Sequence, residues 1–337
     1  MAKNHKKPTL KDVAELSGVS VISASRVMSG GPNISENLRR KVEAAAKSLG
    51  YQRNRIAGSL RGKTSDLVSV IVPSMSNNVF PNIIDGLSES LQDTPLRLVL
   101  GMTQYSDVKE EEILRDMLSW NPAAVIVAGL EHSADTRALL ATYDGPIIEV
   151  MDTDGEATDI AVGVSQIAAG QLIARHFTTR GYRNVGYIGA WGERPVRSRK
   201  RRIAFEAELE RLGNPIKAVQ ICEEASSIMV GAHEMERLLT QNEKLDAVFF
   251  ANDDLAMGAL LYCQKKNIAV PLDVAIAGFN GMEMAQMISP CLTTLRTPRY
   301  DMGRIAGEIL CQRIAGTLER KQFIHELPIE LLLGETS

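Results

Sequence analysis

The first regular pattern of hydrophobic and polar positions lies in residues 9–28, where two short repeats with helical spacing flank a turn. Thr9 and Ser20 each precede a repeat, and their hydroxyls suit the N-terminal ends of helices. Gly18 supplies the positive φ that a sharp turn between two helices needs. The predicted inward positions are Val13, Ala14, Leu16, Ala24 and Val27. This spacing fits a helix-turn-helix, whose second helix enters the major groove of DNA, and it also fits a plain αα-hairpin.

A third repeat follows and adds to a small helical head. Ser35 is placed to cap this third helix after a loop at residues 30–33. Its apolar positions fall on one face at Leu38, Val42, Ala45, Ala46 and Leu49. Three short helices around one core favour the helix-turn-helix over the isolated hairpin. Asn54 then begins a short helix over 55–61, which is too short to persist alone in water. We interpret it as a hinge that forms on DNA or beside a second copy, and the alternative is an inert basic linker.

From Asp66 onward the pattern changes to short β-rich runs that alternate with helical stretches. The runs are 66–73, 96–102, 123–130, 146–151, 159–164, 184–190, 217–222, 246–251 and 274–279. The helical stretches between them include 107–119, 166–180, 199–212, 227–240 and 253–266, and a last strand-like segment spans 322–333. Such alternation predicts parallel sheets covered on both faces, and so many strands exceed one comfortable open sheet. We expect two doubly wound lobes with a ligand cleft at the carboxyl ends of the strands.

Charge separates the head from the remainder. Residues 1–63 hold 13 Lys and Arg against 4 Asp and Glu, a net charge of +9, although the whole chain has a net charge of −3. A basic head on an acidic body is typical of nucleic-acid binding confined to the head. A basic solvated face is the alternative, and it does not explain why the charge coincides with the helix pair.

Composition and motifs exclude several classes of protein. The apolar fraction of 45% and charged fraction of 23% are those of a globular protein, and no apolar run is long enough for a membrane span. No secretory leader precedes the head, so we expect a cytoplasmic protein. The cysteines form no Cys-x-x-Cys pair, so no zinc or disulfide framework is expected. The phosphate-loop, nucleophile-elbow and His-Glu-x-x-His motifs are absent and the five histidines are scattered, so we expect no catalytic residues, metal or cofactor.

Several motifs together resemble one family. They are T-L-K-D-V-A-E-L-S-G-V-S at 9–20, R-K-V-E-A-A-A-K-S-L-G-Y at 40–51, N-R-I-A-G-S-L at 54–60, I-V-P-S-M-S-N-N-V-F at 71–80 and A-N-D-D-L-A-M-G-A at 251–259. In this order they resemble the lactose-repressor family of bacterial transcription factors over essentially the whole chain. Within that family, M-L-S-W-N at 117–121, E-V-M-D at 149–152 and A-I-A-G-F-N-G at 275–281 are similar to the gluconate-repressor branch.

The resemblance implies three parts and a dimer. A small all-α helix-turn-helix domain spans 1–53, a hinge helix and linker span 54–64, and an α/β effector-binding and dimerisation domain spans 65–337. The last has two doubly wound parallel-sheet lobes of periplasmic-binding-protein type. No leucine heptad follows the last strand-like segment, so a homodimer is expected rather than a tetramer.

The resemblance also places the DNA contacts. Residues that read the major groove are Ser20, Val21, Ile22, Ser23 and Arg26. Residues that hold phosphates are Leu10, Ser25, Asn33, Ser35, Tyr51 and Asn54, and residues that enter the minor groove are Ala57 and Leu60. Elementary chemistry agrees, because an arginine donates two hydrogen bonds to a guanine edge and a leucine wedge opens a base step. Family members often carry proline where this chain has Arg53, so its hinge entry is expected to be looser.

The effector residues implied by the resemblance are Ser74, Ser76, Phe80, Ser165, Gln166, Arg201, Asn252 and Asn280. Many members place aspartate where this chain has Asn280, and Asp-Asn where it has Ser165 and Gln166. Fewer carboxylates mean less repulsion of an anion. Basic residues also crowd one segment at Arg194, Arg197, Arg199, Lys200, Arg201 and Arg202. We therefore hypothesise a sugar-acid effector, gluconate or a close relative. The alternatives are a solvated helix face for half of these cations, and lobe packing for Phe80 and Gln166.

The sequence thus predicts a dimeric transcriptional repressor that binds a palindromic double-stranded DNA operator and releases it on binding effector. Because the family also contains members whose effector strengthens DNA binding, co-repression stays open. An enzyme of sugar-acid metabolism with an appended DNA-binding head is a rival from another class, and a plain solute-binding protein is a third possibility. The missing phosphate loop and acid–base pair count against the enzyme, and the basic head and absent secretory leader count against the solute-binding protein.

Overall fold

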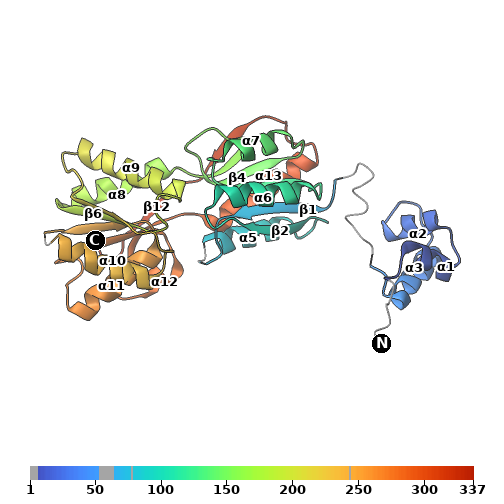
Figure 1. Cartoon of the computed structure of the whole chain (residues 1–337), viewed down its shortest axis with the longest axis horizontal. Helices are drawn as coiled ribbons and strands as arrows, with labels where there is room; N and C mark the ends of the chain where they lie inside the picture. Colours follow the sequence, from blue (N-terminus) through green and yellow to red (C-terminus); the bar gives the residue numbers. More distant parts are fainter. Residues whose placement is uncertain (1–6, 53–63, 77–78, 243) are drawn as a thin grey trace. The chain divides into compact units, whose positions relative to one another are not determined.

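The computed structural model describes residues 7–52, 64–76, 79–242 and 244–337 (Figure 1). The chain divides into two compact units, Met1–Ser65 and Asp66–Ser337, here called the head and the body. The predicted hinge helix over 55–61, with Asn54, Ala57 and Leu60, lies outside the described residues. None of the described helices is both long and apolar enough to span a membrane.

The head consists of α1 (Leu10–Ser17), α2 (Val21–Met28) and α3 (Glu36–Leu49). Thr9 and Asp12 form a reciprocal capping box at the start of α1, and Gly18 after it has a φ of 67°. These predicted local features are confirmed. The helices enclose a core of Val13, Ala14, Ala24, Val27, Val42, Ala45 and Ala46.

One predicted core position in the head is wrong. Leu16 is 56% exposed. The buried face of α1 centres on Val13 and Ala14, and a residue two positions after Ala14 points to the far side of a helix.

The first lobe of the body, lobe 1, is built on a sheet with strand order β11-β5-β4-β3-β1-β2, all parallel. The strands are β1 (Leu67–Val72), β2 (Arg97–Met102), β3 (Ala124–Ala128), β4 (Ile147–Asp152), β5 (Ile160–Val164) and β11 (Phe323–Glu326). The helices are α5 (Val79–Ser90), α6 (Asp107–Leu118), α7 (Ala134–Ala141) and α13 (Arg299–Ile314). The pair α5 and α13 covers one face, and α6 and α7 cover the other.

The second lobe, lobe 2, has the strand order β12-β10-β9-β8-β6-β7, in which only β12 is antiparallel among the described strands. The strands are β6 (Val185–Gly189), β7 (Ala218–Ile221), β8 (Ala247–Phe250), β9 (Ala275–Asn280), β10 (Thr293–Arg296) and β12 (Glu330–Leu332). The helices are α8 (Gln166–Arg180), α9 (Val196–Arg211), α10 (Ile228–Gln241), α11 (Asp253–Lys266) and α12 (Glu283–Met287).

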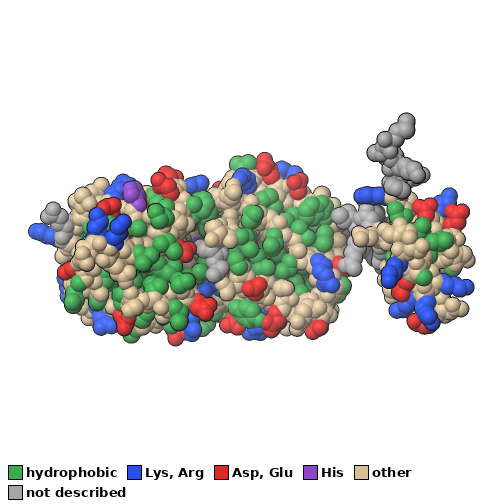
Figure 2. Space-filling model, turned by 90° about the horizontal axis from the view of Figure 1, so that it is seen from below, with side chains coloured by type: hydrophobic (Ala, Val, Ile, Leu, Met, Phe, Trp, Pro, Cys, Tyr) green, Lys and Arg blue, Asp and Glu red, His purple; other side chains and the backbone are tan. Residues whose placement is uncertain are grey.

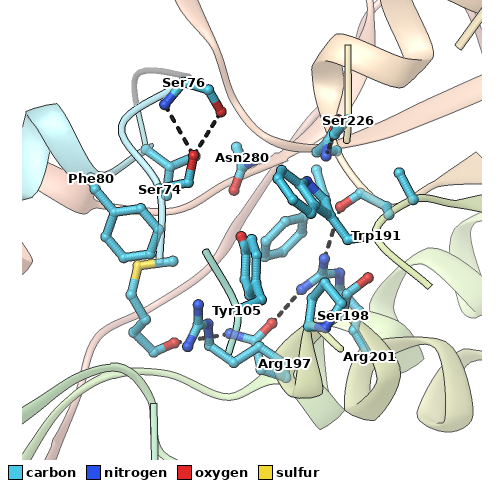
Figure 3. A pocket seen from close by; sticks show the side chains of 18 residues that line it. Ser74, Ser76, Phe80, Tyr105, Trp191, Arg197, Ser198, Arg201, Ser226 and Asn280 are labelled. Atoms are coloured by element: carbon cyan, nitrogen blue, oxygen red, sulfur yellow. Dashed lines mark hydrogen bonds between the residues drawn. The ribbon is translucent and has the colours of Figure 1, made fainter. Parts of the chain in front are cut away.

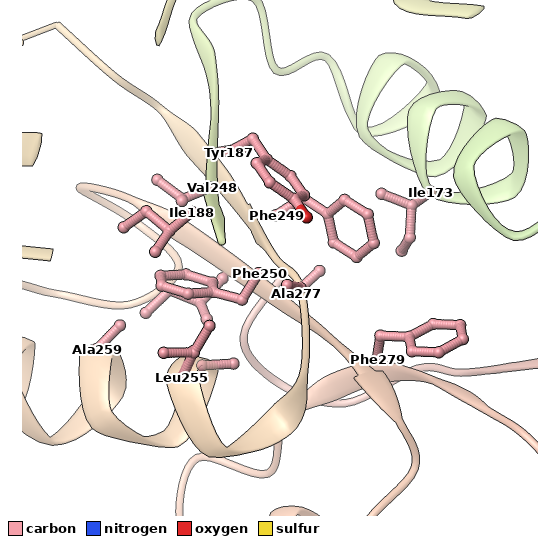
Figure 4. Packing of buried hydrophobic residues seen from close by; sticks show 14 of the residues in the cluster. Ile173, Tyr187, Ile188, Val248, Phe249, Phe250, Leu255, Ala259, Ala277 and Phe279 are labelled. Carbon is pink, nitrogen blue, oxygen red and sulfur yellow. The ribbon is translucent and has the colours of Figure 1, made fainter. Parts of the chain in front are cut away.

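Alternation along β8 fills the core on both faces of the lobe 2 sheet. Figure 4 shows Phe249 on the side of Ile173 in α8 and Phe250 on the side of Leu255 in α11. Successive strand residues point to opposite faces, so a fully buried strand is apolar throughout. This accounts for the continuous apolar run from which the strand was predicted.

Within the described residues the chain crosses between the lobes three times: after β5, after β10 and between β11 and β12. All nine predicted β-rich runs are strands, and the two-lobed fold class is confirmed. The single strand-like segment predicted over 322–333 is two strands in different sheets, because the chain leaves lobe 1 at Leu327 and enters lobe 2 by Glu330. The strand β10 was not predicted.

Candidate nucleic-acid interface and ligand cleft

The second head helix, α2, presents the side chains predicted to read DNA. Val21 and Ile22 are 46% and 75% exposed, which is unusual for large apolar residues that serve only the fold. Ala24 and Val27 on the opposite side are buried. Arg26 is exposed, and its Nη2 donates to the carbonyl of Pro32 at 3.1 Å, so the following loop holds its guanidinium.

The predicted groove residue Ser20 and the predicted phosphate contacts lie around this helix with different degrees of exposure. Ser20 and Ser35 cap α2 and α3, and their Oγ atoms accept from the backbone N–H groups of Ser23 and Leu38. Asn33 is exposed with a φ of 59°. Leu10, Ser25 and Tyr51 are half-buried, and Leu10 and Tyr51 pack on the head core. Asn54, Ala57 and Leu60 lie outside the described residues.

A cleft lies between the two lobes of the body, with about 730 Å³ of empty volume. It brings together seven of the eight predicted effector residues: Ser74, Ser76, Phe80, Gln166, Arg201, Asn252 and Asn280. They come from both lobes. Five of them lie at or just after the carboxyl ends of β1, β5, β8 and β9, where open parallel sheets bind ligands, and Phe80 and Arg201 lie on α5 and α9. Figure 3 shows the labelled side chains surrounding this space.

Ser165 is the predicted effector residue that does not line the cleft. Its Oγ accepts from the N–H of Ala168 and caps α8, and it donates to Oδ1 of Asp154 at 2.7 Å. Its hydroxyl is therefore committed to the local turn.

Two asparagines present amides to the cleft from lobe 2. Asn252 caps α11 through Leu255 N–H, and its Nδ2 donates to Ser226 Oγ at 2.8 Å. Asn280 ends β9 with a φ of 116°, and its carbonyl accepts from the Arg299 guanidinium. The side-chain amide of Asn280 makes no hydrogen bond to the residues that the structure describes. It is free to bind a hydroxyl.

Arg201 is the deeply buried cation of the cleft, 4% exposed. Its guanidinium donates to Gln166 Oε1 and, at 2.8 Å, to the carbonyl of Ala251, and it stacks 3.5 Å from the centre of the Phe279 ring. Its Nε, also buried, finds no partner among the described atoms. Burial lowers the pKa of Arg201 to about 10, and the side chain still carries its charge at neutral pH.

Arg197, one helical turn before Arg201 on α9, is the second cation. It is half-buried, lies 5.9 Å from the centre of the Phe80 ring, and makes no hydrogen bond or ion pair with a described residue. No Asp or Glu is among the described residues that line the cleft. The cavity therefore has two positive charges and no carboxylate to balance them.

The other basic residues of the predicted cluster have carboxylate or backbone partners. Lys200 bonds to Asp152 Oδ2 at 2.8 Å and pairs with Glu131, both from lobe 1. Arg202 pairs with Glu193 and Glu206. The remaining two, Arg194 and Arg199, donate to backbone carbonyls.

Sequence reasoning missed two aromatic residues of the cleft. Tyr105 from lobe 1 and Trp191 from lobe 2 face each other across it, with ring centres 5.2 Å apart. Both have a left-handed backbone, with φ of 57° and 66°. Each follows a strand by two or three residues, β2 and β6 respectively, so their position after a strand end was an available clue.

Comparisons with known proteins follow this division of the chain. Residues 9–54 match the family described as bacterial regulatory proteins, lacI family, and residues 174–337 match the periplasmic binding protein-like domain. The "HTH-type transcriptional regulator GntR" of Pseudomonas aeruginosa is 34% identical over 332 residues, covering 98% of this chain and 96% of that protein. The chain belongs to the lacI family of bacterial regulatory proteins. It is a DNA-binding transcriptional regulator, as the sequence predicted, and these relatives are named as regulators rather than enzymes.

Other relatives and solved structures agree. The GntR regulator of Escherichia coli is 34% identical over 92% of this chain and 93% of its own length. A LacI-family regulator from Silicibacter pomeroyi has a TM-score of 0.93 at 38% identity and covers 98% of this chain and 99% of its own. The lac repressor dimer bound to operator has a TM-score of 0.81 at 24% identity, covers 98% of this chain and 99% of its own, and shows the same fold.

Proposed function

We propose that this lacI-family member is an effector-controlled repressor of sugar-acid catabolic genes, and that a small sugar acid in the interlobe cleft releases it from its operator. The observation that carries the proposal is the charge of the cleft. Arg197 and Arg201 both line it, and no acidic side chain among the described residues does. A weakly hydrated cation with no carboxylate partner attracts an anion strongly in a partly desolvated site.

The remaining lining suits a polyhydroxylated chain. Ser74, Ser76, Asn252 and Asn280 offer hydroxyl and amide groups, and Ser74 and Ser76 hydrogen-bond to each other at 2.7 Å. Phe80 and the aromatic pair Tyr105 and Trp191 offer apolar surfaces to C–H groups. Such a mixture of apolar walls and a few polar groups is typical of small-ligand sites.

The DNA side of the proposal rests on the head and on two-fold symmetry. Val21, Ile22 and Arg26 project from α2 as a major-groove reader requires. A palindromic operator needs two heads, and the body has an apolar face to pair two copies. Figure 2 shows hydrophobic side chains gathered over both lobes. The exposed large apolar residues of the body include Met102, Val108, Met229, Met284 and Met287.

A binding assay tests the function directly. The full-length chain is presented with random DNA duplexes, and the selected palindrome is then titrated by fluorescence anisotropy with and without gluconate, related hexonates and glucose. We expect the hexonates to weaken operator binding, with a coupling of about 1–3 kcal/mol, and glucose to leave it unchanged. Tighter binding in the presence of the acid would make the chain a co-repressed regulator. A stronger response to glucose would contradict the sugar-acid assignment.

A variant of the reader helix separates operator reading from general attraction to DNA. Arg26→Ala should cost roughly 1–3 kcal/mol and relax the preference at one base pair, because a base-reading arginine affects one position. Equal weakening on all duplexes would make Arg26 a phosphate contact instead.

A further inference from the structure

The two arginines of the cleft differ in what their donors already bind. The two terminal nitrogens of Arg201 are used by Gln166 and Ala251, and its plane is covered by Phe279. Gln166 in turn donates to the carbonyl of Met151 at 3.0 Å, at the end of β4. Arg201 therefore fixes the wall of the cleft: each terminal nitrogen already donates once to that wall, and its Nε is buried without a described partner.

Arg197 has the opposite arrangement. Its donors are not engaged by any described residue, and its side chain is half-buried rather than sealed. The residue also lines a second, smaller cavity beside the first, between the ends of β1 and β3 and the start of α6. Asp107, Glu110 and Glu131 line that cavity too, but none of them forms an ion pair with Arg197, and the two glutamates pair with His132 and Lys200. Figure 3 shows Arg197 at the border of the main cleft, near Tyr105.

Arg197 also bridges the lobes without an ion pair. It is rooted in α9 of lobe 2, and its guanidinium lies over Phe80 of lobe 1. It also lies against Gly129, at the end of β3 in lobe 1: a Cβ there would come within 2.8 Å of Arg197 Nη1. Gly129 has a φ of 102°, which other residues rarely adopt, so the sequence leaves room for this guanidinium.

We propose that Arg197 is the residue that recognises the acid group of the effector, while Arg201 positions the surrounding wall. This inference rests on the proposed function, because it needs an anionic ligand in this cleft. A planar guanidinium with free terminal nitrogens binds a carboxylate with two parallel hydrogen bonds, and a neutral CH₂OH group offers no such partner. Because the guanidinium stands between the lobes, the acid group binds where both lobes meet.

Calorimetric titration of the full-length chain with gluconate and with glucitol tests this role. The two ligands share six carbons and differ at one end, where glucitol has CH₂OH in place of the carboxylate. Arg197→Gln should weaken gluconate binding by about 10- to 100-fold and change glucitol binding by less than about 3-fold. Arg197→Lys, which keeps the charge but not the fork, should fall between the two.

Arg199→Gln is the matched control. It removes one positive charge from the same helix, two residues further on, where the side chain donates to the Glu193 carbonyl and does not line the cleft. It should leave the preference for gluconate over glucitol intact. Arg201→Gln should weaken both ligands and lower the melting temperature, because it removes bonds that hold the wall.

Distinct outcomes separate the inference from the function on which it rests. If the unmodified chain prefers gluconate or another hexonate and Arg197→Gln retains that preference, Arg197 does not read the acid group and the inference is wrong. If the unmodified chain prefers glucitol or another neutral ligand, the sugar-acid function is wrong and the inference falls with it. If Arg197→Gln has a lowered melting temperature, Arg197→Lys takes its place in the test. An intermediate loss of gluconate affinity then supports the inference, and an unchanged preference for gluconate contradicts it.

Discussion

The two lobes of the body share an architecture and differ in the chemistry they bring to the cleft. Each is a parallel sheet with helices on both faces, and each directs strand ends toward the other. Lobe 1 supplies hydroxyl and aromatic groups, from Ser74, Ser76 and Phe80. Lobe 2 supplies such groups too, from Ser226 and Trp191, and among the described lining residues it also supplies the amides and both cations, which come from the single helix α9.

Two acidic residues near the cleft come from lobe 1, opposite the lobe that supplies the cations. Asp152 and Glu131 belong to lobe 1, and Lys200 of α9 pairs with both of them. Along α9, Lys200 pairs with two carboxylates of lobe 1. Arg197 and Arg201 line the cleft, where no described carboxylate balances their charges. A duplicated fold therefore gains a charged ligand site through one helix, without altering either sheet.

The largest expected effect tests whether the lobes unfold as one unit. Gly258 in α11 and Gly303 in α13 each lie where an added Cβ would come within 1.9 Å of a backbone oxygen of the partner helix. Backbone cannot rotate away, so either Gly→Ala change should cost about 3 kcal/mol or more. Because the chain crosses between the lobes three times in the described residues, each variant should unfold in a single transition.

Urea denaturation monitored by fluorescence and by circular dichroism checks this cooperativity. Gly155→Ala is the control, because its Cβ would meet side-chain atoms alone, the nearest being the end of Leu130 at 3.2 Å. A variant that unfolds one lobe before the other would show that the crossings do not couple them.

The next effect concerns the ion pair that joins the lobes. Lys200→Met leaves Asp152, which is fully buried, without its cation. Removing one partner of a buried pair costs about 3 kcal/mol, and partial exposure of Lys200 reduces this to about 2 kcal/mol. Burial already raises the pKa of Asp152, and the variant should raise it further, so its stability should fall more steeply with rising pH. If Lys200→Met had the same free energy of unfolding as the unmodified chain throughout pH 5 to 8, the pair would contribute nothing to stability.

A smaller effect concerns a titrating group in lobe 1. Burial disfavours the charged form of His132, but hydrogen bonds to Glu110 and Glu149 outweigh it and raise its pKa to about 9. The stability from this proton is fully present below about pH 6.5 and is lost as pH rises through 9. In urea denaturation between these two pH values, the free energy of unfolding of His132→Gln should not show this loss. A variant with the slope of the unmodified chain would assign it to other groups.

The smallest effect concerns the corresponding group in lobe 2. Burial raises the pKa of Asp253 to about 6, although the N–H of Met282 and the hydroxyl of Thr294 bind its carboxylate. Its contribution is present below about pH 4 and is lost as pH rises through 6. The body should therefore lose stability in two separate pH windows, one set by a group in each lobe. Denaturation of Asp253→Asn should abolish the acidic window alone, and loss of both windows would contradict this separation.

Local sequence cues predicted the head more fully than the cleft. Capping residues and a turn glycine act within a few positions, so Thr9, Gly18 and Ser20 could be placed from the sequence. The nine predicted strands were equally clear from their apolar runs, whereas β10 is short, begins with two threonines and was missed. The error at Leu16 arose because a short helix buries a narrow face, which one apolar residue does not define.

The cleft depended on contacts between distant parts of the chain. Seven residues that line the cleft followed from the family resemblance as predicted effector residues, but Tyr105 and Trp191 are placed by left-handed loop backbone that no local pattern specifies. Sequence spacing showed that basic residues crowd 194–202, and it could not show which of them find carboxylates. Lobe 1 places the carboxylate of Asp152 beside Lys200, whereas it places the ring of Phe80 beside Arg197.

The three crossings also govern how this protein is made. A ribosome releases the head early, and the head has its own core, so it can fold while the remainder is still being translated. Lobe 1 cannot follow at once, because α13 and its edge strand β11 are encoded after nearly all of lobe 2. Until α13 emerges, the apolar face of α5 lacks its helix partner. Until residue 326 emerges, β5 lacks its neighbouring strand β11. A nascent chain therefore carries a folded DNA reader before it carries a body able to respond to a ligand.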